Sequence, residues 1–197
     1  MAVDRKLSVE DILDLRAYER ERQEFRSQVM ALKRRRRVHL GSIITLVFEN
    51  RDTVRFQIQE MARAERILTD EGIAVEVGIY NPLIPEPGQL SATLFLELTS
   101  DEQLREWLPK LVGIERSIVV RLDDGDEIRC IPEEGHEATL TRDEVTASVH
   151  YIRFELTDAQ VEAFGAGATL AVDHPEYRAE TRLSADTVAE LLTDLRP

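Results

Sequence analysis

The chain has 197 residues and a formal net charge of −13. Hydrophobic residues make up 43% of it and charged residues 32%, which is the composition of a globular protein with a sizeable core. These values exclude an intrinsically disordered chain. They also argue against general nucleic-acid binding, because an acidic surface repels a phosphate backbone.

The N-terminal segment, the apolar runs and the cysteine content predict a cellular location. Residues 1–7 are polar and lack the apolar stretch of a secretory signal. The longest apolar run, residues 43–48, is far shorter than the roughly 20 residues of a membrane-spanning helix. The single cysteine, Cys130, allows no internal disulfide and no thiolate cluster for an iron–sulfur centre. We therefore expect a cytoplasmic protein without a membrane span, in which Cys130 is a small buried side chain.

Charge is unevenly distributed along the chain. Residues 1–40 contain 11 Lys or Arg and 7 Asp or Glu, whereas the remainder contains 14 and 31. Five basic residues form the run Lys33-Arg34-Arg35-Arg36-Arg37 at the end of a predicted helix. Positive side chains are favourable at the negative end of the helix dipole, so the run is interpreted as a helix end that pairs with the acidic body. The alternative is a site for an anion or an acidic partner.

The first predicted helices follow from an N-cap residue and from a shift of the apolar positions around the helix axis. Ser8 and the acidic residues that follow it predict the start of a short helix. The apolar positions then shift phase, which predicts a bend near residues 15–17 and a second helix to about Arg35. Residues 43–48 are mostly β-branched or aromatic and predict a strand covered on both faces.

Residues 53–70 predict a long amphipathic helix. At 100° per residue, Gln59 and the arginines gather on one side and the apolar residues on the other. Three polar residues, Gln57, Glu60 and Glu65, fall inside the apolar sector. Since an unpaired buried carboxylate costs several kcal/mol, we expect these three side chains to have partners.

The remaining elements follow from turn and capping residues. Three prolines predict an ordered connection at residues 80–88. Strands are predicted at residues 92–98, 118–122, 127–131, 147–156, 169–172 and 179–183. Helices are predicted after the caps Ser100, Thr157 and Ser184. The pattern favours an α+β fold with a mixed or mostly antiparallel sheet, a long N-terminal helix and a central packed helix. We expect residues 1–197 to form a single compact domain, with residues 1–37 as a helical arm.

Local catalytic signatures are absent from the sequence. It contains no phosphate-binding loop, dinucleotide-binding turn, nucleophile elbow or helical zinc motif, so no nucleotide cofactor is predicted and whether the protein is an enzyme stays open. The polar candidates are Gln57, Glu60, Glu65 and His150, with Glu49 and Glu97 as further members. Such groups can ligate a divalent metal, and Glu60 with His150 can form an acid/base pair.

Each of these candidates also has a structural interpretation. Glu60 and Glu65 can form ion pairs with Arg22, Arg26 or other arginines and thereby hold the long helix in place. His150 lies between residues of an inward-facing strand pattern, which favours a hydrogen-bonded core histidine. His174 is interpreted as a turn residue whose ring is oriented by its neighbour, with a site role as the alternative.

Six segments together resemble a known bacterial family. They are Arg-Arg-Val-His-Leu-Gly at residues 36–41, Leu-Val-Phe-Glu-Asn-Arg-Asp-Thr at 46–53, Gln-Ile-Gln-Glu-Met at 57–61, Tyr-Asn-Pro-Leu-Ile-Pro at 80–85, Val-His-Tyr-Ile-Arg-Phe at 149–154 and Asp-His-Pro-x-Tyr at 173–177. In order and over nearly the whole chain, they resemble the uncharacterised family catalogued as domain of unknown function 3501.

The resemblance implies a cellular context and no catalytic residues. Proteins of this kind tend to be encoded beside a rubrerythrin-like protein and an iron–sulfur oxidoreductase. The resemblance therefore implies a non-catalytic accessory or interaction partner of that redox system, and the sequence leaves a homo-oligomer open. The alternative is a metal-dependent or acid/base enzyme that uses the Gln/Glu/His cluster.

Overall fold

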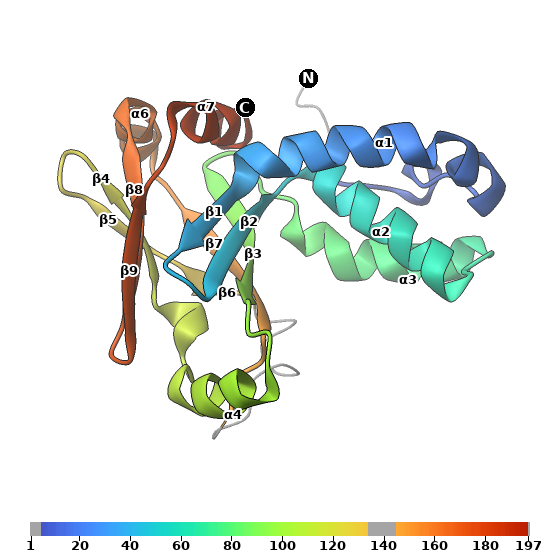
Figure 1. The fold of residues 1–197 in the computed structure, drawn as a ribbon. Coiled ribbons are helices and arrows are strands. Elements are labelled where there is room, and N and C mark those ends of the chain that lie inside the picture. The colour runs from blue at the N-terminus through green and yellow to red at the C-terminus, as the bar shows by residue number, and fades with distance from the viewer. Residues whose placement is uncertain (1–4, 134–144, 197) are drawn as a thin grey trace.

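Two antiparallel sheets lie at the centre of the fold, and a lobe of helices packs against the larger one (Figure 1). The computed structural model describes residues 5–133 and 145–196. Every strand pair within this part of the chain is antiparallel. The predicted α+β class, with its long N-terminal helix and its central packed helix, is therefore confirmed.

The strand order is β1-β2-β3-β7-β6 in the larger sheet and β5-β4-β8-β9 in the smaller one. The larger sheet contains β1 (Arg37–Leu40), β2 (Ile44–Glu49), β3 (Gln89–Leu96), β6 (Ile131–Pro132) and β7 (Val149–Glu155). The smaller sheet contains β4 (Ile118–Leu122), β5 (Glu127–Arg129), β8 (Ala168–His174) and β9 (Tyr177–Arg182). The hydroxyls of Tyr177 and Thr181 donate to the backbone carbonyls of Leu40 and His39. These bonds join β9 to β1, so the two sheets meet at one edge.

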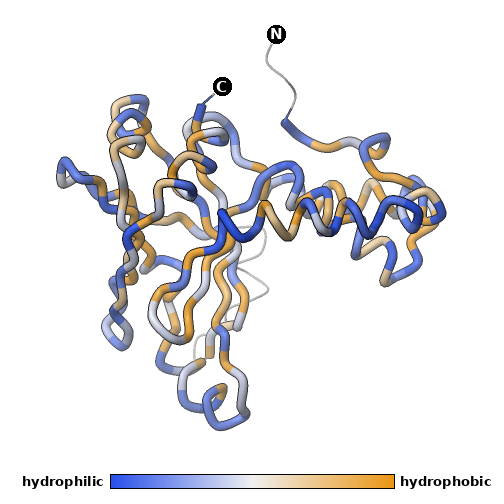
Figure 2. The backbone as a smooth tube through the Cα atoms, turned by 45° about the horizontal axis from the view of Figure 1, so that its top comes forward, coloured by the Kyte–Doolittle hydropathy of each residue, from blue (hydrophilic) through white to orange (hydrophobic). Residues whose placement is uncertain are grey.

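The main core lies between the sheets. Side chains alternate between the two faces of each strand, so Leu46 and Phe48 of β2 join this core while Val47 and Glu49 face the helices. Every residue of β2 is buried, which confirms the predicted strand with two covered faces. Figure 2 shows that hydrophobic residues are concentrated in the strands of the two sheets.

The α-helices that the structure describes begin at polar capping residues. They are α1 (Leu15–Arg36), α2 (Arg51–Glu65), α3 (Asp70–Tyr80), α4 (Asp101–Lys110), α6 (Asp158–Ala166) and α7 (Ala185–Leu195). The short 3₁₀ helices are η1 (Val9–Asp11), η2 (Asn81–Leu83) and η3 (Ile114–Arg116). The N-cap side chains that accept a first-turn backbone N–H are Asp14, Asn50, Thr69, Ser100, Thr157 and Ser184. Within the described residues, no helix is both long and apolar enough to cross a membrane.

The helix expected over residues 53–70 is shorter than predicted. Helix α2 ends at Glu65, because Arg66 adopts the left-handed conformation with φ of 56°. Thr69 then accepts from the backbone N–H of Gly72 and starts α3, which has no counterpart among the predicted elements. Helix α3 carries apolar residues on several sides, so it lacks the periodicity by which a helix is recognised in a sequence.

A second apolar cluster holds the helical lobe together. Helix α1 lies along α2 and reaches α7, and α2 packs against α3 (Figure 1). The cluster includes Ile12, Val54, Ile58, Val77 and Leu83. It lies on the far side of the larger sheet from the main core, so this sheet is covered on both faces.

Candidate functional site

The helix-facing side of the larger sheet carries polar groups where the lobe covers it. Thr93 of β3 stands opposite Tyr151 of β7, and Phe95 stands opposite Val149. Together with Glu49, they border a cavity of about 250 Å³ beneath helices α1, α2 and α3. This interlayer cavity is lined by Lys33, Glu49, Val54, Gln57, Tyr80, Leu83, Thr93, Phe95, Val149 and Tyr151.

Glu49 is the buried acid of the interlayer cavity, with 8% of its surface exposed. One carboxylate oxygen accepts a hydrogen bond of 2.6 Å from the hydroxyl of Thr93. No Lys, Arg or His among the residues that the structure describes forms an ion pair with it. A carboxylate has about four acceptor positions, and the Thr93 hydroxyl occupies one of them. Burying such a group is unfavourable, which makes Glu49 a candidate for a functional role.

A basic group and two phenols share the cavity with Glu49. Lys33 extends from α1 and is half-buried, with its ammonium 6.0 Å from the centre of the Phe56 ring. Burial raises the pKa of Tyr151, and the nearby Tyr80 and Glu49 raise it further. The Tyr151 hydroxyl therefore stays protonated and is a hydrogen-bond donor at neutral pH.

The remaining cavity wall is apolar. This part of the wall consists of Val54, Leu83, Phe95 and Val149. Gln57 borders the cavity from α2. A few placed polar groups in an apolar hollow are typical of sites that bind small molecules. The arrangement offers an acceptor at Glu49 and a cation at Lys33 to one ligand.

Glu60 forms an ion pair with an arginine, which was the structural alternative to a role in metal binding or acid/base catalysis. Its two oxygens accept hydrogen bonds of 2.8 Å each from Arg22, and one accepts a bond of 2.7 Å from the Tyr18 hydroxyl. The bonds from Arg22, followed by the bond from Tyr18, hold the pKa of Glu60 below its usual value despite partial burial. This cluster joins α2 to α1.

The other predicted site residues do not meet Glu60. Gln57 and Glu65 are exposed, although Gln57 also borders the interlayer cavity, so the expectation that both are turned away from water is wrong. His150 faces the opposite side of the larger sheet, with ring contacts of 2.9 Å to the Thr146 hydroxyl and the Ala147 carbonyl. Within the described ranges, residues 5–133 and 145–196, no three His, Cys, Asp or Glu side chains are grouped so that they could hold a metal ion.

The buried face of α2 is rotated from the predicted one. Gln59 was expected on the solvent side but is buried. Its amide accepts from the backbone N–H of Leu13 and donates to the carbonyl of the same residue, at 2.8 and 3.1 Å. Those backbone groups belong to the link between η1 and α1, which regular helix bonds do not satisfy. Because these backbone groups need hydrogen-bond partners, the Gln59 side chain points inward and binds them.

The basic run at the end of α1 is divided between several contacts. Arg35 and Arg36 pair with Glu190 of α7, each with an N–O distance of 2.9 Å. Arg34 and Arg37 are exposed, and Lys33 reaches the interlayer cavity. The interpretation as a helix end that pairs with the acidic body is supported for the two paired arginines.

Cys130, Glu97 and His174 occupy positions that suggest no chemistry. Cys130 is buried as expected, and burial raises the pKa of its thiol to about 12. Glu97 is exposed and does not line the interlayer cavity. The ring of His174 lies 3.0 Å from the Val112 carbonyl and accepts from the backbone N–H of Glu176, so it supports the turn between β8 and β9.

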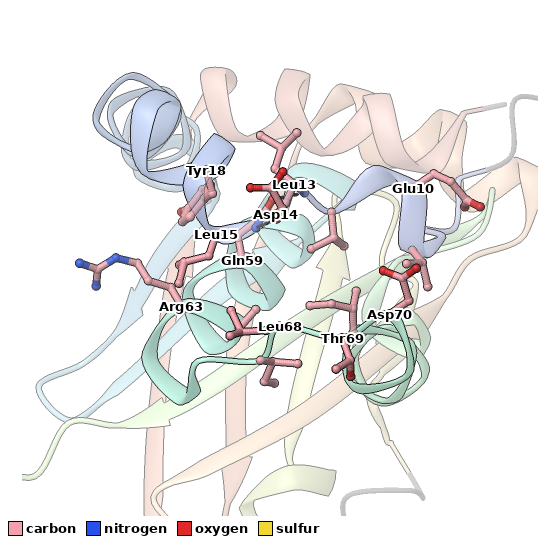
Figure 3. Close-up of a pocket in the computed structure, with 15 residues that line it drawn as sticks. Glu10, Leu13, Asp14, Leu15, Tyr18, Gln59, Arg63, Leu68, Thr69 and Asp70 are labelled. Atoms are coloured by element: carbon pink, nitrogen blue, oxygen red, sulfur yellow. Dashed lines mark hydrogen bonds between the residues drawn. The ribbon is translucent and has the colours of Figure 1, made fainter.

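A second cavity, of about 310 Å³, lies at the outer end of the helical lobe (Figure 3). Its principal polar side chains already have protein partners. Asp14 and Thr69 cap helices, Gln59 binds backbone, and Arg63 pairs with Glu19. This cavity therefore offers fewer free groups to a ligand than the interlayer cavity does.

Comparison with known proteins identifies the family. The model of a family described as protein of unknown function (DUF3501) matches residues 6–195. The chain is a member of the DUF3501 family. A crystal structure of a novel protein of unknown function from Burkholderia pseudomallei is similar, with 38% sequence identity and a TM-score of 0.87. The match covers 96% of this DUF3501 chain and 99% of that chain. Among curated proteins, none matches.

The family membership confirms the resemblance seen in the sequence and leaves the function open. Both the family and the similar Burkholderia protein are described as having an unknown function. The segments on which the resemblance rests include Glu49, Gln57, Tyr80 and Tyr151. These four residues come together at the interlayer cavity of this DUF3501 protein.

Proposed function

We propose that the protein binds a small polar molecule in the interlayer cavity, where Glu49 accepts a hydrogen bond or a proton from it. The observation that carries this proposal is the buried carboxylate of Glu49, which faces a cavity and accepts from the Thr93 hydroxyl, its one donor among the residues that the structure describes. Buried charges are normally paired or serve a function, because burial without compensation is unfavourable. A bound ligand that donates to Glu49 adds a further partner to this carboxylate.

The dimensions of the cavity limit the ligand. Pockets for drug-sized molecules begin at roughly 300 Å³. At about 250 Å³, the interlayer cavity takes a smaller molecule. The ligand class is therefore a small metabolite with at least one donor group, and the site differs from the Glu60–His150 pair considered from the sequence.

Calorimetry with simple donor-bearing probes tests this proposal. Propylamine and propanol are titrated into the wild-type protein and into Glu49→Gln, which removes the charge and keeps the shape. We expect saturable binding of propylamine to the wild type, with a loss of about tenfold or more in the variant. Glu65→Gln is the matched control, because Glu65 is exposed on α2. Equal binding by the wild type and Glu49→Gln, or no saturable binding by either, contradicts the proposal.

A second candidate function is that of an accessory protein in a redox system, as the family resemblance implies. The outer side of α3 and the turn before it favour it, because Leu68, Val75 and Ile79 are 74%, 59% and 43% exposed. Asp70 and Glu71 lie at the edge of this apolar stripe and are also exposed. A partner that fits it has an apolar patch with a basic rim, and we propose the iron–sulfur oxidoreductase as that partner.

Co-purification tests the accessory function. The double variant Val75→Glu with Ile79→Glu is expected to release the iron–sulfur oxidoreductase, because two carboxylates replace exposed apolar contacts. The control places the same charges elsewhere, at the exposed positions Gln23 and Gln28 of α1. Retention of the oxidoreductase by the α3 variant, or its absence from the wild-type complex, contradicts this candidate.

A further inference from the structure

Two groups of opposite charge line the interlayer cavity without pairing with each other. Glu49 comes from β2 and Lys33 from α1. Glu49 accepts from the Thr93 hydroxyl through its side chain and from Arg36 through its backbone carbonyl. For Lys33, no acidic partner occurs among the residues that the structure describes. Both residues line the same cavity, so a ligand there lies beside side chains of both charges.

The position of Lys33 on α1 explains why it reaches the cavity. Val29 is buried, and Lys33 follows it by four residues on the same face of the helix. The side chain therefore projects toward the lobe interior, where its ammonium lies near the Phe56 ring. Arg35 and Arg36 lie at other angles around α1 and pair with α7 instead.

The surroundings of Glu49 suit a cationic group. Phe95, Tyr80 and Tyr151 supply aromatic rings to the same cavity. Ammonium groups bind favourably to a carboxylate and to the faces of aromatic rings. The apolar wall formed by Leu83 and Val149 suits a short hydrocarbon segment between the two ends of the ligand.

We propose that the interlayer cavity binds small zwitterions, with the ligand ammonium at Glu49 and the ligand carboxylate at Lys33. This inference rests on the proposed function and adds the substrate class. A ligand with one charge compensates Glu49 or Lys33 alone, whereas a zwitterion of the right length compensates both. The volume of about 250 Å³ favours a chain of few carbon atoms.

A series of amino acids with terminal amino groups tests which distance between the ligand ammonium and the ligand carboxylate fits the cavity. Glycine, β-alanine, 4-aminobutyrate and 5-aminopentanoate are titrated by calorimetry, together with butylamine and butyrate as single-charge counterparts. We expect one member of the series to bind about tenfold or more tightly than either counterpart, since each charge-assisted hydrogen bond is worth at least that factor.

Two variants test the contacts of the ligand ammonium and of the ligand carboxylate separately. Glu49→Gln is expected to lower the affinity for the best zwitterion to that for butyrate, and Lys33→Met to lower it to that for butylamine. Arg34→Met is the control for Lys33, because it removes a neighbouring charge that is exposed. Circular dichroism and urea unfolding establish that each variant is folded, and Thr93→Val provides a second perturbation of the Glu49 carboxylate.

The outcomes distinguish this inference from the proposed function. If butylamine binds as tightly as every zwitterion and Lys33→Met changes nothing, the zwitterion assignment is wrong while ligand binding at Glu49 stands. If neither the zwitterions nor butylamine bind, both proposals are wrong. A chain-length optimum that both variants abolish supports the inference.

Discussion

Arg36 and Asp194 form two hydrogen bonds, of 2.7 and 3.1 Å, although 158 residues separate them in the chain. Arg36 is completely buried, and Asp194 is 7% exposed. Glu190 contributes further contacts to the same guanidinium. This cluster ties the end of the first long helix to the last helix, and it also sets the direction in which the chain enters β1.

Replacement of Arg36 by Met is expected to destabilise the protein by about 3–5 kcal/mol, because it leaves the buried Asp194 carboxylate without its partner. Urea unfolding measures this loss. The double variant with Asp194→Asn is expected to recover part of it, since the uncompensated charge is then absent. Arg35→Met is the control, because Arg35 is exposed and its pair with Glu190 contributes about 0–1 kcal/mol. A loss for Arg36→Met as small as that for Arg35→Met is evidence against the pairing.

The contact between α1 and α2 is expected to weaken in acid. The pKa of Glu60 is lowered from the ordinary value of 4.5 by the bonds from Arg22 and then by that from Tyr18. A carboxylate with a lowered pKa in the folded state stabilises the fold above its unfolded value, and this contribution disappears as the pH falls through the folded value. The stability difference between the wild type and Glu60→Gln should therefore shrink as the pH falls from about 7 to about 3.

Unfolding by urea across this pH range measures the difference. Glu65→Gln serves as the comparison, because Glu65 is exposed and is on the same helix. A difference for Glu60→Gln that is independent of pH contradicts the ionised pair.

Local sequence patterns were sufficient to predict most strands and several helix starts. Alternation along residues 149–155 correctly separates His150, which faces the core, from Tyr151, which faces the helices. Capping residues correctly predict the helices after Ser100, Thr157 and Ser184. These features depend on neighbours within a few residues, so a single sequence contains the information.

The candidate site depends on contacts that no local pattern contains. Glu49 and Thr93 meet because β2 pairs with β3, and Tyr151 joins them because β7 pairs with β3. That register is a tertiary property. The rotation of α2 is another such property, since Gln59 turns inward to bind the backbone of Leu13. Helical periodicity predicts an apolar face, but a distant backbone group decides which polar residue joins it.

Removal of the Glu49 charge is expected to stabilise the ligand-free protein. Glu49→Gln keeps an acceptor for Thr93 and removes a buried charge, so we expect a gain of about 1 kcal/mol in the free energy of unfolding. Thr93→Val removes the hydroxyl that donates to the carboxylate and is expected to lower stability by about 1–3 kcal/mol. Urea unfolding at neutral pH checks both. A functional acid held at the expense of stability predicts these opposite signs, whereas a structural acid predicts losses in both variants.

The junction between the two sheets requires a glycine at position 41. Gly41 has φ of 67°, and a Cβ atom there would overlap the hydroxyl of Tyr177. That hydroxyl donates to the Leu40 carbonyl and accepts from the Ser42 N–H, at 2.9 and 3.0 Å. Gly41→Ala therefore introduces backbone strain of about 1–2 kcal/mol and also displaces these bonds.

Gly125→Ala separates the two effects, because Gly125 has φ of 99° and nothing within 4 Å of the added Cβ. We expect thermal unfolding to show a larger loss for Gly41→Ala than for Gly125→Ala. Combining Gly41→Ala with Tyr177→Phe removes the oxygen that the new methyl group meets. The combined loss should therefore be smaller than the sum of the two single losses, since both changes disrupt the same pair of hydrogen bonds. Additive losses mean that the Tyr177 hydroxyl is not what restricts position 41.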